Sequence, residues 1–381
     1  MLYLQGVCNE AIKVIYDMVN IKDILKSKEY DEVNSILRLA GSLGKEEGVE
    51  VYVVGGFVRD ILMNNPVNDI DLMTVGEGIP FARKLAIKLG KENIVAFEKF
   101  GTALIPGKNF QIEVATARKE AYDSDSRKPS DIIFTDLQGD LHRRDFTINA
   151  MALDISESNY GELTDPFGGL ADIKKKVIKT PLNPNETFSE DPLRMMRAAY
   201  FASKLGFKID KNCRKSIQDN VSRISIVSKE RIRDEFIKIL KTKKPSIGLI
   251  ILQKTGLMEI VFPEIHVMYG MNQTSEWHHK DIFAHTMQVV DNAALLSDKM
   301  EIRFAALVHD IAKPNTRRID KRKGYTFHGH DAVGEKMLNV VSSRMKLSNY
   351  LKNYLKKLTL LHLRPIALVK NTVTDSAVRR L

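Results

Sequence analysis

The sequence predicts an α+β protein in which a small mixed sheet with helices precedes an all-helical body and a helical C-terminal domain. Apolar, β-branched runs bounded by Gly and Pro occur at 51–54, 102–105 and 111–115, a pattern typical of strands. Beyond about residue 160, helical periodicity dominates. The predicted parts are an N-terminal helical extension at 1–48, a sheet-containing head at 49–160, a helical neck and body at 161–265 and a final domain at 266–381.

The composition is that of a globular protein. The 381 residues, 44% hydrophobic and 28% charged, are enough for two or three domains with separate cores. No apolar run approaches the ~18 residues that a membrane-spanning helix needs, and the N-terminus becomes charged too early for a signal peptide. The two cysteines, Cys8 and Cys213, are too few and too far apart for a disulfide framework. We therefore expect a cytoplasmic protein without membrane association, and no protein partner is evident.

The positive charge is concentrated in one segment. The chain has a net charge of +10, and residues 204–244 contain 13 Lys and Arg against 5 Asp and Glu. This surplus is consistent with a bound polyanion such as RNA. A solvated helical surface is the alternative that charge alone leaves open.

A strand, a turn and an arginine follow one another in the stretch VVGGFVRD at 53–60. The paired glycines, Gly55 and Gly56, break a buried apolar run and let backbone N–H groups approach phosphate oxygens closely. Arg59 supplies a fork of donors nearby. The stretch predicts a strand that ends in a phosphate-binding turn.

Two carboxylates follow in the stretch DIDL at 69–72. In an extended strand, Asp69 and Asp71 face the same side of the sheet and repel each other unless a cation lies between them. Mg²⁺ prefers oxygen ligands and keeps phosphates among them. An isolated Asp-x-Asp also occurs in surface turns, but its position after the strand, Gly-Gly and Arg favours nucleotidyl transfer with two metal ions.

The remainder of the head is predicted to contain a helix and a loop. Residues 80–89 have helical periodicity and end at Gly90. Residues 118–140 are polar and punctuated by Pro and Gly, so they are expected to form largely a mobile loop.

A second group of polar residues occurs in LHRRDFTINA at 141–150, just before a strand-like run. Arg144 is suited to a triphosphate, and Asp145 can accept a hydrogen bond from a ribose hydroxyl. A structural ion pair between Arg and Asp explains the composition equally well.

A third group occurs in EDPLRMMR at 190–197. Asp191 is a candidate N-cap and Pro192 a candidate first helical residue, so that Asp191, Arg194 and Arg197 share one helix face. A carboxylate and a guanidinium together match the amino group and ring nitrogen of cytosine and adenine, whereas uracil and guanine present the reverse pattern. The alternative is a capping Asp with surface arginines.

Histidines are concentrated in the last part of the chain. His285 lies on a predicted helix, and His309 and Asp310 follow another apolar helical run. Imidazole and carboxylate groups that converge from separate helices are suitable ligands for Zn²⁺, Mn²⁺ or Fe²⁺. A single buried histidine is more often structural, so the prediction depends on the whole set.

Three of these motifs resemble bacterial class II tRNA nucleotidyltransferases and poly(A) polymerases, which have a polymerase β-like head. The similar strings are GGFVRDILMNNPVNDIDL at 55–72, RRDFTINA at 143–150 and EDPLRMMRAAYF at 190–201. Residues 207–265 resemble the neck of that family, against which a tRNA acceptor stem is expected. Tyr200 departs from the family, which often has an arginine there.

The resemblance implies a role for each motif residue. Asp69 and Asp71 would hold two Mg²⁺ ions, and Glu113 would be either a third carboxylate or an ordinary exposed strand residue. The nucleotide would be bound by Gly55, Gly56, Arg59 and Arg144 at the triphosphate, Asp145 at the ribose and Asp191, Arg194 and Arg197 on the base-reading helix.

The histidine-rich part resembles the HD domain of metal-dependent phosphohydrolases. His285, His309 and Asp310 match its metal ligands, and Asp375 is the expected fourth ligand. His328 or His330 could complete a wider site. A structural metal and a catalytic one require the same ligands.

The predicted function is the addition of CCA, or part of it, to tRNA 3′ ends from CTP and ATP. A poly(A) polymerase, a CC-only enzyme and an A-only enzyme share the same motifs. An HD-domain phosphohydrolase is the alternative from another class. Residues 377–381 have the composition of a continuing helix. The resemblance implies a helical tail that contacts tRNA, and we expect this tail to be missing here.

Overall fold

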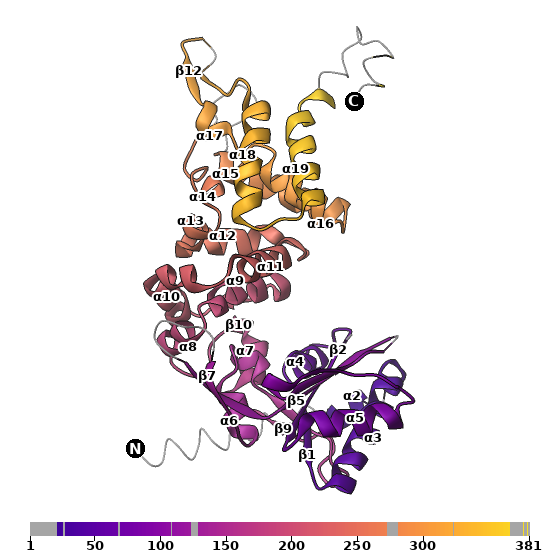
Figure 1. The fold of residues 1–381 in the computed structure, drawn as a ribbon. Coiled ribbons are helices and arrows are strands. Elements are labelled where there is room, and N and C mark those ends of the chain that lie inside the picture. The colour runs from indigo at the N-terminus through magenta and orange to yellow at the C-terminus, as the bar shows by residue number, and fades with distance from the viewer. Residues whose placement is uncertain are drawn as a thin grey trace, which may run out of the picture. The chain divides into compact units, whose positions relative to one another are not determined.

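The computed structural model describes residues 21–25, 27–67, 69–107, 109–122, 129–272, 281–322, 324–365, 376 and 379. The chain divides into two compact units, Met1–Thr187 and Phe188–Leu381 (Figure 1). Within the described ranges, no helix has both the length and the apolar character needed to cross a membrane. The finer division into four parts stays a prediction.

A mixed seven-stranded sheet forms the centre of the first unit. The strand order is β3-β4-β5-β2-β1-β8-β9, in which β2 and β5 are parallel and the other described pairs are antiparallel. The strands are β1 (Glu50–Val54), β2 (Asp69–Val75), β3 (Val95–Phe97), β4 (Thr102–Ile105), β5 (Gln111–Thr116), β8 (Ala152–Asp154) and β9 (Leu163–Thr164). The predicted α+β class, with helices beside a small mixed sheet, is confirmed.

Both faces of this sheet are covered. Because side chains alternate between faces along a strand, Val53 and Leu72 lie on one face and Val54 and Met73 on the other, and all four are buried. Helices α3 (Asp31–Glu47) and α5 (Gly78–Lys88) pack together against the sheet (Figure 1). Gly41 of α3 permits close packing, since a Cβ atom there would lie 2.0 Å from the carbonyl oxygen of Ile155.

The segment after β5 is more ordered than expected. Residues 118–140 were predicted to be largely a mobile loop, but β6 (Arg118–Tyr122) and β7 (Pro129–Phe134) form an antiparallel hairpin. Helix α6 (Leu137–His142) follows, capped by Asp136, whose Oδ1 accepts a hydrogen bond from the Gly139 N–H at 2.8 Å. The prediction was wrong because each strand obtains its hydrogen-bond partners from the other, which polar composition does not reveal.

Shorter elements complete the first unit. They are α2 (Ile21–Leu25), η1 (Lys28–Tyr30), α4 (Gly56–Leu62), η2 (Glu98–Phe100), η3 (Thr147–Asn149), α7 (Gly169–Lys175), β10 (Val177–Ile178) and the start of α8 (Pro184–Glu190), which extends into the second unit. The predicted helix at 80–89 corresponds to α5.

The second unit is almost entirely helical, as predicted. Its first half contains α9 (Leu193–Leu205), β11 (Lys208–Ile209), α10 (Lys211–Asn220), η4 (Val221–Ile226), α11 (Lys229–Leu240), α12 (Pro245–Thr255), α13 (Leu257–Val261) and α14 (Pro263–His266). Its second half contains α15 (Ile282–Leu296), α16 (Met300–Val308), α17 (Lys313–Thr316), the hairpin of β12 (Arg318–Asp320) and β13 (Gly324–Thr326), α18 (His330–Arg344) and α19 (Asn349–Leu361).

The two halves of the second unit share a core. Phe236, Phe262 and Phe304 are fully buried, with ring centres 5.6–6.3 Å apart, and they join α11, the turn before α14 and α16. Arg303 is also buried, and its Nη1 donates hydrogen bonds to the carbonyl oxygens of Leu240 and Thr242 at 3.0 Å. The helices that carry the histidines are therefore anchored to the preceding helical body.

Candidate nucleotide-transfer site and histidine cluster

Three carboxylates lie together on one face of the sheet. Strands β2 and β5 run parallel with Asp71 beside Glu113, and Asp69 lies on the same face two residues before Asp71. Asp69 and Glu113 are exposed, and Asp71 is half-buried. Burial and the charges of Glu113 and Asp69 raise the pKa of Asp71 to about 6, although Arg144 and Arg59 oppose the shift. Such a cluster is stabilised by bound cations.

Gly55 brings the turn after β1 close to this cluster. Its φ of +71° is unfavourable for residues with side chains. A Cβ atom at Gly55 would lie 2.8 Å from Arg144 Nη1 and 3.5 Å from Asp71 Oδ2. The glycine therefore leaves room for a guanidinium beside the carboxylates.

Asp140 holds that guanidinium in position. Arg144 donates two hydrogen bonds to Asp140 Oδ2, at 3.1 and 2.8 Å, and Arg143 donates two to Oδ1, at 3.1 and 2.6 Å. Burial of Asp140 opposes its ionisation, yet Arg144 and Arg143 hold the pKa of this carboxyl below its usual value. The sequence prediction missed Asp140. The spacing of an Asp three and four residues before two arginines on a helix end is the signal that could have revealed it.

Arg59 and Asp145 belong to a buried network. Arg59 pairs with Asp60 at 2.7 Å, and its Nη1 donates to Asn149 Oδ1 at 2.5 Å. Asn149 in turn donates to Asp145 Oδ1 at 3.0 Å, and the same oxygen accepts from the Phe146 N–H. Arg59 is 3% exposed, so this guanidinium supports the turn from within the protein. Its direct contact with a triphosphate stays a prediction, as does the contact of Asp145 with ribose.

The predicted base-reading residues lie at the start of α9 in the second unit. The helix begins at Leu193 with Pro192 as its N-cap, one residue later than predicted. Asp191 caps it from outside, since its Oδ1 accepts a hydrogen bond from the Leu193 N–H at 3.1 Å. Its other oxygen lies 3.4 Å from Arg231 Nη2 of α11. Pro192 already has helical φ and ψ angles of −60° and −18°, so the difference of one residue lies within the usual uncertainty of a helix boundary.

The two arginines of α9 have different surroundings. Arg194 is 7% exposed, and its Nη1 lies 3.1 Å from Glu190 Oε2. Arg197 is half-buried, with its guanidinium 5.3 Å from the ring centre of Phe201 and its Nη1 3.8 Å from Glu235 Oε1. Both are thus held by their neighbours, and their roles toward a base stay predictions.

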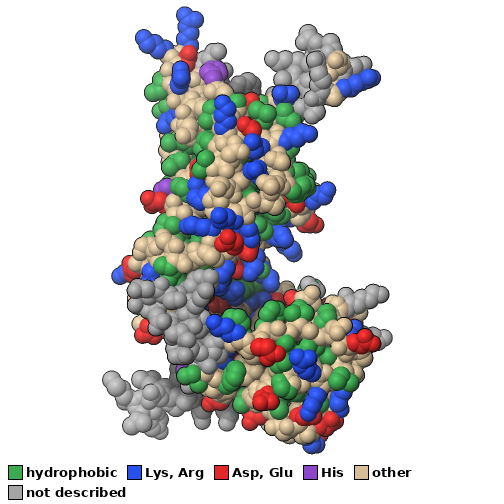
Figure 2. Space-filling view, viewed as in Figure 1, with side chains coloured by type: hydrophobic (Ala, Val, Ile, Leu, Met, Phe, Trp, Pro, Cys, Tyr) green, Lys and Arg blue, Asp and Glu red, His purple; other side chains and the backbone are tan. Residues whose placement is uncertain are grey.

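A basic surface surrounds these helices in the second unit. Figure 2 shows Lys and Arg side chains distributed over the visible face of this unit, with Asp and Glu side chains among them. Ten of the 13 basic residues at 204–244 are exposed: Lys204, Lys208, Lys211, Arg214, Lys215, Lys229, Lys238, Lys241, Lys243 and Lys244. These ten side chains are accessible to a polyanion, as the interpretation of residues 204–244 as a polyanion-binding surface requires.

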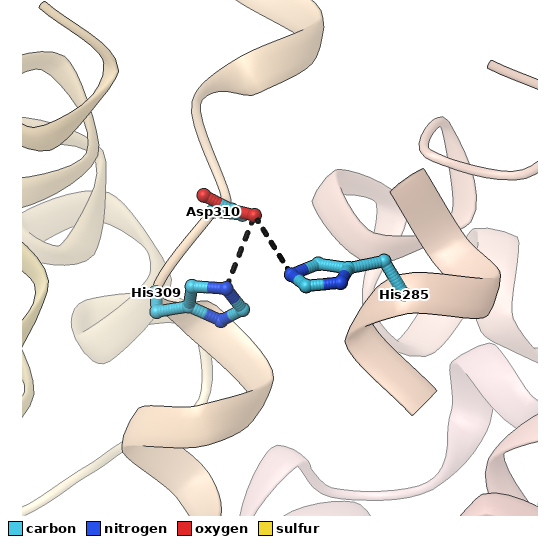
Figure 3. Close-up of side chains that lie close together, drawn as sticks. All are labelled: His285, His309 and Asp310. Carbon is cyan, nitrogen blue, oxygen red and sulfur yellow. Dashed lines mark ion pairs between the residues drawn. The ribbon is translucent and has the colours of Figure 1, made fainter. Parts of the chain in front are cut away.

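The histidine cluster converges on Asp310. His285 comes from α15 and His309 caps the end of α16, and their Nε2 atoms lie 3.7 and 3.0 Å from Asp310 Oδ2 (Figure 3). Although burial raises the pKa of Asp310, hydrogen bonds from His309 and His330 hold it below its usual range. These three side chains can hold a metal ion. Asp375, the predicted fourth ligand, lies outside the described residues.

Two further histidines approach Asp310 from its other side. His330, which the sequence left as an alternative ligand, and His362, which it did not indicate, form a second group with Asp310 that can hold a metal ion. His328 is exposed and belongs to neither of these groups.

Family models match three parts of the chain. Residues 51–179 match the poly A polymerase head domain, 206–268 match the probable RNA and SrmB-binding site of polymerase A, and 282–375 match the HD domain.

Among solved structures, a tRNA nucleotidyltransferase complexed with a primer tRNA and an incoming ATP analogue is similar, with a TM-score of 0.66 and 27% identity. The similarity covers 90% of this chain and 89% of that one. A CCA-adding enzyme with ATP has a TM-score of 0.68 and 25% identity, over 95% of this chain and 78% of that one.

Two curated relatives are similar over most of the chain. The multifunctional CCA protein of Shewanella frigidimarina is 34% identical over 79% of this chain and 70% of its own length. That of Vibrio parahaemolyticus is 34% identical over 80% of this chain and 73% of its own length. By this similarity, the chain belongs to the family of multifunctional CCA proteins.

Proposed function

We propose that this protein is a template-independent tRNA nucleotidyltransferase that adds CCA, or part of it, to tRNA 3′ ends from CTP and ATP. The carboxylate cluster of Asp69, Asp71 and Glu113 is the observation that carries the proposal. Burial and the neighbouring charges of Glu113 and Asp69 raise the pKa of Asp71, so a bound cation would stabilise the ionised carboxylate. A binding protein needs no such arrangement, whereas a metal-dependent transferase does.

The donor set fits Mg²⁺. The cluster offers carboxylate oxygens, which Mg²⁺ prefers, and Asp71 is only half-buried, so water and phosphate oxygens can complete the coordination. Asp69 and Asp71 would hold two Mg²⁺ ions, which supply charge stabilisation for in-line attack of the tRNA 3′-hydroxyl on the α-phosphate. Glu113 lies beside Asp71, where its carboxylate would help to position the attacking 3′-hydroxyl.

The positive side chains near the cluster bind the triphosphate. Arg144 is held by Asp140 with its Nη1 beside Gly55, so it presents a fixed guanidinium next to the carboxylates. Gly56 and Arg59 would also hold the triphosphate, with the Arg59 guanidinium oriented by its hydrogen bond to Asn149. Asp145, which accepts a hydrogen bond from the same Asn149, would select ribose. Fixed donors of this kind stabilise charge without reorganisation.

Base selection is assigned to the start of α9. Asp191 would accept from the amino group of cytosine or adenine, and Arg194 would donate to the ring nitrogen. Arg197 lies one turn further along the helix and supports the reading surface. The exposed basic residues at 204–244 would contact phosphates of the tRNA acceptor stem, and a cytoplasmic location agrees with this substrate.

The histidine cluster would bind a divalent transition metal such as Zn²⁺, Mn²⁺ or Fe²⁺. His285, His309 and Asp310 offer imidazole and carboxylate donors that fit these ions better than Mg²⁺. Asp375 remains the proposed fourth ligand. Phosphatase and cyclic phosphodiesterase assays on an Asp69→Asn/Asp71→Asn double variant test whether this domain hydrolyses phosphoesters on its own.

The decisive experiment offers tRNAs that end before CCA, after C and after CC to the protein, with each labelled nucleoside triphosphate supplied separately. Complete CCA addition predicts C incorporation on the first two and A incorporation on the third. Long A tails from ATP alone would instead identify a poly(A) polymerase. Incorporation of C on the first two tRNAs without A on the third would identify a CC-only enzyme, and incorporation of A on the third tRNA alone would identify an A-only enzyme.

A variant pair tests the metal assignment. Asp71→Ala should abolish incorporation while tRNA binding persists, because the carboxylate acts in chemistry and not in RNA contact. Glu92→Gln, a charge loss at an exposed position of the same unit, should leave both unchanged. Normal incorporation by Asp71→Ala would contradict the assignment.

A further inference from the structure

Residues 317–326 form a basic hairpin in the second half of the second unit. Strands β12 and β13 make a two-stranded sheet of their own, and the sequence of the hairpin contains five Lys or Arg against one acidic residue, Asp320. Figure 1 shows β12 at the end of the second unit that lies away from α9 and α10. At the same place, Figure 2 shows Lys and Arg side chains that extend into solvent. The basic hairpin is therefore a charged surface separate from residues 204–244.

Three cations of the basic hairpin are available to a ligand. Arg318, Lys321 and Arg322 are exposed, and none of them forms an ion pair with another residue that the structure describes. Asp320 is used in the turn, where its Oδ1 accepts a hydrogen bond from the Arg322 N–H at 2.8 Å. A hairpin of two strands is only marginally stable by itself, and like charges close together on it repel. These charges lower the stability of the hairpin, which favours a role in binding an anion.

A fourth cation is held in place at the base of the basic hairpin. The guanidinium carbon of Arg317 lies 3.8 Å from the ring centre of Tyr325. Ile319 pairs with Tyr325 across the two strands, and its side chain is 78% exposed. A guanidinium stacked on an aromatic ring is already ordered, so it loses less conformational freedom when it binds a phosphate. Cations beside an aromatic ring are typical of surfaces that bind nucleic acids.

We propose that the basic hairpin binds the phosphate backbone of double-stranded RNA and so gives the second unit another tRNA contact besides residues 204–244. This inference rests on the tRNA substrate proposed above. Double-stranded RNA is recognised by its shape and by phosphate and 2′-hydroxyl contacts spread over many base pairs. Basic side chains at separate places on one unit can therefore contact the same duplex. Phosphate contacts carry no sequence information, so the basic hairpin serves tRNAs of any sequence.

The test measures binding of a labelled tRNA that ends before CCA to the full chain, between about 50 and 200 mM salt. The triple variant Arg318→Gln/Lys321→Gln/Arg322→Gln should weaken binding about 10- to 100-fold at the lower salt concentration. The slope of log K against log salt concentration should become less negative by about 2–3, because three phosphate contacts are lost. In single-nucleotide incorporation, the KM for tRNA should rise and kcat should stay unchanged, because these side chains bind the RNA and take no part in the chemistry.

The triple variant Lys299→Gln/Lys336→Gln/Lys357→Gln is the matched control. It removes three exposed positive charges from α18, α19 and the start of α16, in the same half of the second unit, and should bind tRNA as the wild type does. Thermal unfolding followed by circular dichroism should show that the hairpin variant is at least as stable as the wild type, because neutral side chains remove the repulsion.

The outcomes separate the basic hairpin from the proposed function. Wild-type affinity and salt slope in the hairpin variant would overturn the hairpin contact while nucleotide transfer stands. Equal losses in the hairpin and control variants would reveal a general effect of net charge and would also overturn it. Weakened binding to phosphatidylserine vesicles with unchanged tRNA binding would identify a membrane contact instead. If no variant and no wild-type protein incorporates nucleotides, but the hairpin variant loses affinity for tRNA, the proposed function falls and the hairpin contact stands.

Discussion

Replacing Asp71 with asparagine should stabilise the metal-free head and abolish nucleotide transfer. Folding raises the pKa of Asp71 from 3.8 to about 6, so the folded state disfavours the ionised carboxylate. A shift of one pKa unit corresponds to about 1.36 kcal/mol, so the ionised group lowers the free energy of unfolding by about 3 kcal/mol at pH 8. Asparagine has nearly the same shape and no charge, which removes this penalty.

The sign of the pH dependence follows from the raised pKa. Below about pH 3 the carboxyl is largely protonated in both states and carries almost no penalty. As pH rises toward 6, the unfolded chain loses its proton before the folded chain does, and the wild type is progressively destabilised. The advantage of Asp71→Asn over the wild type should therefore grow from about 1.5 kcal/mol at pH 5 to about 3 kcal/mol at pH 8.

Urea unfolding of the full chain in EDTA, followed by circular dichroism and by hydrogen exchange of the sheet amides, measures this difference. Added Mg²⁺ should stabilise the wild-type head by mass action and leave Asp71→Asn unaffected. Glu92→Gln controls for the loss of an exposed charge. Equal stabilities of the wild type and Asp71→Asn at pH 8 would refute the electrostatic reasoning.

Three further substitutions test the surroundings of the site. Gly55→Ala should lower stability by about 1–3 kcal/mol and raise the KM for nucleotides, because its positive φ disfavours alanine and the new Cβ displaces Arg144; wild-type melting and KM would argue against this. Asp140→Ala should lower stability by about 1–3 kcal/mol in thermal unfolding, since it leaves the partly buried guanidinium groups of Arg143 and Arg144 without their carboxylate; an unchanged transition would contradict this role of Asp140. Arg231→Met should weaken discrimination of CTP and ATP against UTP and GTP by removing one of the groups that position Asp191, as single-nucleotide incorporation with each triphosphate would reveal; unchanged selectivity would exclude a role of this contact in base selection.

Local features of the fold and site were accessible from the sequence. The strand at Glu50–Val54, the paired strands at Thr102–Ile105 and Gln111–Thr116 and the helix α9 follow from apolar periodicity and from Gly and Pro positions. The shared face of Asp69 and Asp71 follows from the two-residue repeat of a strand. The exception is the hairpin of β6 and β7, whose polar strands are stabilised by each other.

Long-range neighbours were decided only by the tertiary structure. Glu113 joins Asp71 because β2 and β5 pair in parallel, across a separation of 42 residues that no local pattern encodes. His362 reaches Asp310 from the end of α19 because helix packing brings the helix ends together. The sequence by itself determined which residues carry chemistry, because motif spacing acts within one element. Only the packing of distant elements decided which of these residues meet, since contacts between elements depend on register and helix placement.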